Sequence, residues 1–238
     1  MEELIQIPKI KGIANDVDGV FFKTEHLQNQ ATSLTSKKFF KHEVTKQEWI
    51  EKWVGQSTFA ILKYLADIYN PNVDLNELAH YRENVLKELM KKETIQTMPY
   101  AKTMLEYQNI LSQNGFKIAF STGGSVDETT MKFEKAALSY LIKEFPIIGK
   151  DTKGVNYGKP SPDTYLITAK KLDLKPENLV VLEDTEVGIK SAINAGIIYA
   201  LAIPNEYTKN KEFIFAHDRL NNLNEAIIKI DLVLKDYI

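Results

Sequence analysis

Carboxylate, hydroxyl and lysine side chains follow short apolar runs at several places in this sequence. The first such run, Ile10–Asn15, stops at Asp16, and Asp18 comes two residues later, directly before a glycine. One carboxylate of such a pair could attack a phosphorus atom while the other transfers the proton of the leaving group. The same residues would also fit a solvated Asp-Gly turn, so this segment alone leaves both interpretations open.

A hydroxyl side chain and two glycines follow the second run, Phe116–Phe120. Thr122 comes before Gly123 and Gly124, and Ser125 then opens a predicted helix. Backbone N–H groups at the start of a helix bind phosphate oxygens. The alternative is a glycine-rich turn in which Ser125 only caps the helix.

A lysine in a proline-rich loop is the third feature. Lys159 lies between Gly158 and Pro160, just before a predicted helix start at Ser161 and Pro162. The helix dipole repels a cation at this end, so an anionic group nearby would explain the lysine. An ordinary surface lysine in a loop is the alternative.

Two adjacent acids, Glu183 and Asp184, follow the apolar run Leu179–Leu182. Carboxylate oxygens are the ligands that Mg²⁺ prefers in proteins. Capping of the next helix by Asp184 or Thr185 is the simpler alternative.

The elements that must position these residues alternate between strand-like and helical patterns. Helical signals separate the later apolar runs: Ser125 and Glu128 form a capping box before a helix expected over 131–141, and Thr185 can cap a helix that Gly196 ends. This alternation predicts an α/β fold, with a parallel sheet covered on both faces. Ligands of such sheets bind at the carboxyl ends of the strands. The two remaining strand-like runs are Ile147–Ile148 and Ile197–Ile203.

The segment 24–97 has a different pattern, in which every periodic stretch is helical. Thr45 and Glu48 form another capping box, and apolar residues at helical spacing precede Pro71 and recur after Leu78. We therefore expect a helical cap domain over 24–97, inserted into a core domain made of 1–23 and 98–238. The two chain crossings could form a hinge for a lid that excludes water.

Composition narrows the possible partners. The 238 residues carry 30 basic and 32 acidic side chains, a net charge of −2, so nucleic acid and an anionic membrane are not expected partners. Cysteine is absent, which excludes disulfides and thiol catalysis. The acidic N-terminus lacks the pattern of a signal peptide, and we expect a cytoplasmic monomer or homodimer.

Taken together, the motifs resemble those of the haloacid dehalogenase superfamily of phosphatases and phosphomutases. The segments 16–20, 115–123, 158–163 and 181–196 resemble its four motifs in order, and the resemblance covers nearly the whole chain. The fold it implies is a Rossmann-like parallel sheet core. The inserted helices resemble the cap of the β-phosphoglucomutase-like branch.

The resemblance implies a role for each motif residue. Asp16 would be the nucleophile that forms an aspartyl-phosphate, and Asp18 would protonate the leaving group and then activate water. Thr122, Gly123 and Lys159 would hold the phosphoryl group. Mg²⁺ would be bound by Asp16, the backbone carbonyl of Asp18, Glu183 and Asp184. The cap loop at Gly55, Gln56 and Ser57 resembles the segment that reaches the leaving group, although Gly55 could simply end a helix.

Several positions depart from the family pattern. Asn15 stands where an apolar aromatic is usual, and Gly188 stands where some members carry a further metal carboxylate that Glu183 could replace. Thr58 stands where the mutases of this branch carry a phosphate-binding arginine. The remaining departures are Lys23 for an acid, Gln28 for a histidine and Tyr100 for a glycine.

The leading hypothesis is therefore a magnesium-dependent phosphatase of a small phosphorylated metabolite such as a sugar phosphate. A phosphomutase is disfavoured because Thr58 and Gln28 leave the cap without an obvious clamp for a second phosphate. A phosphoprotein or phosphotyrosine phosphatase would need a cap that opens widely. A catalytically silent binding module is disfavoured by the complete acid set, and a dehalogenase would leave Glu183 and Asp184 without a role.

Overall fold

A computed structural model describes residues 9–235 of the chain. Within this range, six strands form one parallel sheet in the order β3-β2-β1-β4-β5-β6. The central strand β1 (Gly12–Asn15) lies between β2 (Lys117–Ser121) and β4 (Leu179–Glu183). The outer strands are β3 (Ile147–Ile148), β5 (Tyr199–Ala202) and β6 (Asp218–Arg219).

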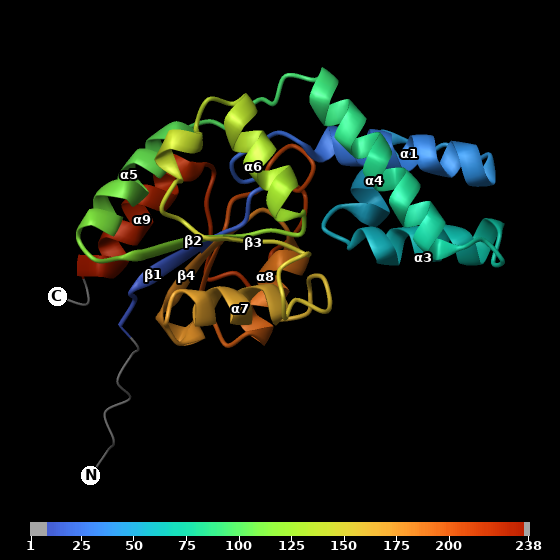
Figure 1. Ribbon diagram of the computed structural model, residues 1–238. Coiled ribbons are helices and arrows are strands. Elements are labelled where there is room, and N and C mark those ends of the chain that lie inside the picture. Colours follow the sequence, from blue (N-terminus) through green and yellow to red (C-terminus); the bar gives the residue numbers. More distant parts are fainter. Residues whose placement is uncertain (1–8, 236–238) are drawn as a thin grey trace, which may run out of the picture.

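Helices cover both faces of the sheet, as the sequence predicts (Figure 1). One face carries α5 (Ala101–Gln113), α6 (Val126–Lys135) and α9 (Leu223–Lys235), and the other carries α7 (Asp163–Lys171) and α8 (Glu186–Asn194). Each layer buries its own apolar cluster against the sheet. Removal of apolar area from water is the main favourable term in folding. These two clusters therefore hold the helices against the sheet and keep the strands, with their carboxyl ends, in place.

Four helices of the inserted segment lie beyond the carboxyl edge of the sheet (Figure 1). They are α1 (Glu25–Phe40), the short α2 (Lys46–Glu48), α3 (Thr58–Tyr69) and α4 (Leu75–Lys92), with a π-helical turn, Trp49–Trp53, after α2. Trp49 and Trp53 are buried with Ile61 and Leu65 in a separate cluster, to which the core contributes Tyr207. The predicted helical cap is therefore present, while the exact domain boundaries stay a prediction.

The two chain crossings between these helices and the sheet run side by side. Phe22 and Thr97 form an antiparallel bridge, the N–H of Lys23 donates to the Gln96 carbonyl, and the N–H of Met98 donates to the Phe21 carbonyl. Tyr100 then takes a left-handed conformation at φ 64° before α5 begins. This backbone geometry favours glycine, which is the residue that the family pattern has at this position.

Two helix boundaries differ from the sequence prediction. The helix expected over 131–141 is α6, which begins directly after Ser125 and is followed by a separate 3₁₀ turn, Ser139–Leu141. The Ser125 hydroxyl accepts from the N–H of Glu128, as the capping box predicts. The α7 helix begins at Asp163, so Pro162 rather than Ser161 occupies the cap position. Such one-residue shifts are common where proline sets the local backbone.

Candidate active site

Parallel strands with matched register bring the predicted residues to one edge. Asn15 pairs with Phe120 of β2 and with Leu182 of β4. The residues that follow these positions, Asp16, Ser121 and Glu183, therefore emerge together at the carboxyl end of the sheet.

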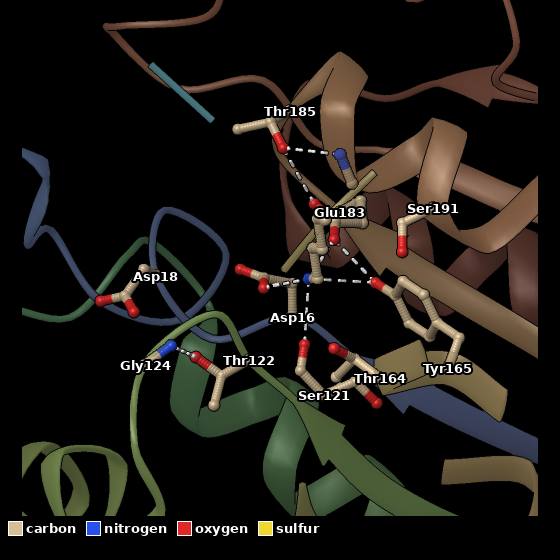
Figure 2. A network of polar contacts seen from close by, with 12 residues as sticks. Asp16, Asp18, Ser121, Thr122, Gly124, Thr164, Tyr165, Glu183, Thr185 and Ser191 are labelled. Carbon is tan, nitrogen blue, oxygen red and sulfur yellow. Dashed lines mark hydrogen bonds and ion pairs between the residues drawn. The ribbon is translucent and has the colours of Figure 1, made fainter. Parts of the chain in front are cut away.

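Lys159 reaches this edge from the loop before α7. Its ammonium donates to Asp16 Oδ1 at 2.6 Å, to Glu183 Oε1 at 2.5 Å and to the Ser121 carbonyl at 3.0 Å. Figure 2 shows Asp16, Glu183, Ser121 and Tyr165 joined by one network of polar contacts. The Tyr165 hydroxyl donates to the same Glu183 oxygen at 2.7 Å. The anionic group that the sequence argument requires beside Lys159 is therefore a pair of carboxylates.

Three acids meet in this network and could hold a cation. Ligand oxygens of Asp16, Glu183 and Asp184 all lie within 4.8 Å of one another, and all three residues are buried. Burial, followed by the charges of Asp16 and Glu183, raises the pKa of Asp184 well above its usual value. Burial likewise raises the pKa of Asp16 to about 8, although Lys159 opposes the shift. These acids carry more negative charge than one ammonium neutralises, so the donor set fits a hard divalent cation.

Two glycines give these acids room. A Cβ at Gly188 would lie 2.0 Å from the Glu183 carboxylate, which therefore fills the space a side chain would need. Gly19, at φ 80°, lets the loop after Asp18 pass so close to Asp184 that a Cβ there would lie 1.9 Å from Asp184 Oδ2. Asn205, which the sequence analysis missed, donates to that oxygen at 2.7 Å. Glu183 thus takes the space that the family pattern gives to an acid at position 188.

Asp18 points away from the three acids, and Figure 2 shows it apart from their network. Its two carboxylate oxygens accept from the Lys132 ammonium at 2.6 and 2.8 Å. The Thr24 hydroxyl donates to one of the same oxygens. Neither partner was expected from the sequence, because Lys132 lies on α6 beyond the segment 115–123 and Thr24 lies directly before α1.

The phosphate-binding segment predicted after β2 lies beside the cluster. Thr122 is fully buried, and its hydroxyl accepts from the N–H of Gly124 at 3.0 Å (Figure 2). Gly123 and Gly124 line a cavity of about 350 Å³ together with Asp16 and Lys159. The backbone of Gly123 and Gly124, just before α6, therefore faces the cavity, and the Thr122 hydroxyl accepts from one of its N–H groups.

The helices beyond the sheet close the other side of this cavity. Gly55, Gln56 and Ser57 line it, as predicted for the cap loop, and they lie against the core. A Cβ at Gly55 would lie 3.0 Å from Thr185, and a Cβ at Gly158 would lie 3.2 Å from the Ser57 side chain. The remaining cap residues around the cavity include Glu25, Gln28, Trp49, Thr58, Phe59, Arg82 and Glu83.

The polar side chain of Asn15, directly before Asp16, contacts a helix rather than the site. It points to the face of the sheet that α5 covers, where it exchanges two hydrogen bonds with Gln108 of α5 at 3.1 and 2.8 Å. Both side chains are completely buried. A polar residue before the nucleophile is therefore satisfied by a partner that sequence patterns did not reveal.

Comparison with known proteins gives the class to which this fold and site belong. The family model described as haloacid dehalogenase-like hydrolase matches residues 13–202, and the chain belongs to that family. A phosphorylated carbohydrates phosphatase of Thermotoga maritima is 24% identical over 192 residues, covering 79% of this chain and 82% of the relative. Hexitol phosphatase A of Escherichia coli is 26% identical over 194 residues, covering 79% and 81%.

A solved structure shows the same fold with the same helical insertion. The β-phosphoglucomutase of Clostridium difficile superimposes with a TM-score of 0.74 at 19% identity, covering 96% of this chain and 98% of that one. The predicted superfamily and fold class are therefore confirmed. The family match and the relatives named phosphatases support the predicted enzyme class, a phosphoric monoester hydrolase. Across residues 9–235, no helix has the length and apolar character that crossing a membrane requires.

Proposed function

We propose that this protein is a magnesium-dependent phosphatase of small phosphorylated metabolites, sugar phosphates among them, with Asp16 as the nucleophile. The observation that carries the proposal is the convergence of Asp16, Lys159, Glu183 and Asp184 at one strand edge. The cation would be held by Asp16, Glu183, Asp184 and the backbone carbonyl of Asp18, and when bound it would neutralise charge on the transferring phosphoryl oxygens.

The protein residues account for both half-reactions. A carboxylate oxygen of Asp16 attacks phosphorus, the bond from phosphorus to the ester oxygen breaks, and that oxygen takes a proton from the Asp18 carboxyl group. In the second half, Asp18 takes a proton from water, the water oxygen attacks phosphorus, and the bond to Asp16 breaks to release inorganic phosphate. Lys159 and the N–H groups after Thr122 would hold the phosphoryl oxygens throughout.

The far wall of the cavity favours a monophosphate with hydroxyl groups. Glu25, Gln28 and Glu128 line it and offer oxygens that accept hydrogen bonds. The two cations of this wall already have partners: Arg82 donates to Gln28 and Thr32, and Lys150 to Glu83. A second phosphate would therefore have to displace the existing contacts of Arg82 and Lys150, which weighs against a mutase with a bisphosphate intermediate.

The test is a panel of phosphorylated sugars, polyols, nucleotides and phosphopeptides, assayed for phosphate release with Mg²⁺ and with EDTA. We expect Mg²⁺-dependent release from one group of small alkyl phosphates and none from Asp16→Asn. Isomerisation of a sugar phosphate without release would instead support a mutase. No release from any compound, including p-nitrophenyl phosphate, would refute the proposal.

A further inference from the structure

Lys132 is a second buried lysine, and it contacts the Asp18 carboxylate rather than Asp16. It lies on α6, its side chain is completely shielded from solvent, and it donates to both oxygens of Asp18. Its third contact is Glu128, one turn earlier on the same helix, at 2.8 Å. The ammonium thus has three carboxylate oxygens around it and no contact with water.

Stability alone does not explain a lysine at this position. Its neighbour Phe133 is buried with Phe22 and Phe120 in the core cluster on this face of the sheet. Buried ion pairs lose much of their Coulomb attraction to desolvation, and apolar residues of similar volume often serve as well or better. An apolar side chain would be the simpler solution on this face of α6.

The contact has a specific geometric effect on Asp18. Two hydrogen bonds from Lys132 and one from Thr24 hold the carboxylate at the cavity wall, outside the cluster of Asp16, Glu183 and Asp184. Asp18 nevertheless lines the same cavity as Asp16. A carboxylate left free beside these acids would add a fourth negative charge to the cluster, and its position would not be defined.

We infer that Lys132 is a positioning residue, which holds the Asp18 carboxylate at the cavity wall where it can serve the ester oxygen and the attacking water. The inference rests on the proposed function. It predicts that loss of Lys132 harms the proton-transfer steps and spares the attack of Asp16 on phosphorus.

Leaving groups of different basicity separate these two steps. An alkyl phosphate needs a proton on its ester oxygen as the bond breaks, whereas nitrophenolate leaves without one. In Lys132→Met, we expect kcat for the best alkyl phosphate of the panel to fall about 10- to 100-fold, a part of the usual contribution of general acid–base catalysis. KM should change by less than about threefold, because Lys132 contacts no part of the substrate.

The aryl ester gives the decisive readout. With p-nitrophenyl phosphate, Lys132→Met should release a rapid burst of nearly one nitrophenolate per enzyme, followed by slow turnover, because water attack on the aspartyl-phosphate still needs Asp18. Lys132→Arg retains a cation with paired donors and should restore most of the alkyl phosphatase activity. Lys135→Met, one turn further along α6, removes only contacts to the Met90 and Lys91 carbonyls and serves as the matched control.

Each outcome decides between the two roles. If burst and steady-state rates of Lys132→Met fall in parallel with its folded fraction, Lys132 is only structural and the inference is wrong. Unchanged kcat on the alkyl phosphate also overturns it. Should Lys132→Met not fold, Lys132→Gln, which keeps an N–H donor without the charge, is measured with the same expectations. An inactive wild-type protein would overturn the proposed function itself, whereas an active wild type with an unaffected variant overturns only the assignment of Lys132.

Discussion

Two buried lysines of this protein each join two carboxylates, yet their surroundings differ in charge. Lys159 binds Asp16 and Glu183, and the nearby Asp184 adds a third carboxylate. Lys132 binds Asp18 and Glu128. In the first group the acids outnumber the ammonium by three to one, and in the second by two to one.

The pKa directions of the acids follow this difference. Burial raises the pKa of Asp16 to about 8 even with Lys159 in contact. Burial would also raise the pKa of Glu128, but the charges of Lys132 and Arg82 outweigh it, and its pKa is lowered. The charges around Lys132 are therefore nearly balanced within the protein, whereas the Asp16 cluster keeps an excess of negative charge that suits a cation and a reacting phosphate.

The largest expected effect comes from neutralising the nucleophile. Asp16→Asn should lower phosphate release by at least about 10⁴-fold, as loss of a covalent nucleophile does elsewhere. In EDTA at pH 9, the same change should leave the melting temperature unchanged or raise it, because it removes one of three crowded negative charges. Phosphate-release assays check the loss of activity, and thermal unfolding checks the stability. A clear drop in melting temperature would contradict the conclusion that the Asp16 cluster carries an excess of negative charge.

The opposite change at the same cluster should be strongly destabilising. Lys159→Met leaves Asp16 and Glu183 buried without a cation, and loss of one partner of a buried ion pair typically costs about 3–5 kcal/mol. Urea unfolding in EDTA at pH 9, where Asp16 is ionised in the wild type, measures this loss.

The Asp16→Asn background provides a control for Lys159→Met. There the lysine has one charged partner fewer, so its removal should cost less, and the coupling between the two sites should be positive. Equal losses in both backgrounds would mean that Lys159 acts through packing rather than through charge.

The Asp16 cluster could be predicted from the sequence because its members are the residues that end adjacent strands. Asp16 and Glu183 each follow an apolar run directly, and Thr122 comes two residues after one. Parallel register then brings these strand ends together without further information. The anionic neighbour expected beside Lys159 followed from its unfavourable place before a helix, whereas its phosphoryl-binding role came from the family resemblance.

The contacts of Lys132 could not be predicted in the same way. Asp18 and Lys132 are 114 positions apart, and the direction of Lys132 depends on how α6 is rotated against the sheet. The capping box at Ser125 predicted a helix here, but the sequence pattern did not show which face of that helix turns toward the sheet. The only available signal was the spacing of Glu128 and Lys132, one helical turn apart. This spacing could not show that the pair is buried, because exposed ion pairs on helices have the same spacing. Gln108, the partner of Asn15, was missed for the same reason.

The smallest expected effect tests the balanced charges around Lys132. Glu128→Gln keeps the shape of the side chain but removes the charge that Lys132 contacts at 2.8 Å, while Asp18 still pairs with the ammonium. Because a hydrogen bond to a charged group contributes about 1.5–3 kcal/mol, we expect stability to fall by about 2 kcal/mol in urea unfolding. The two neutralising changes then have opposite signs under the same metal-free conditions: Asp16→Asn relieves repulsion and Glu128→Gln removes attraction. If Asp16→Asn and Glu128→Gln both raised the stability, Lys132 would also lie among excess negative charge. The proposed difference between the surroundings of Lys132 and Lys159 would then be wrong.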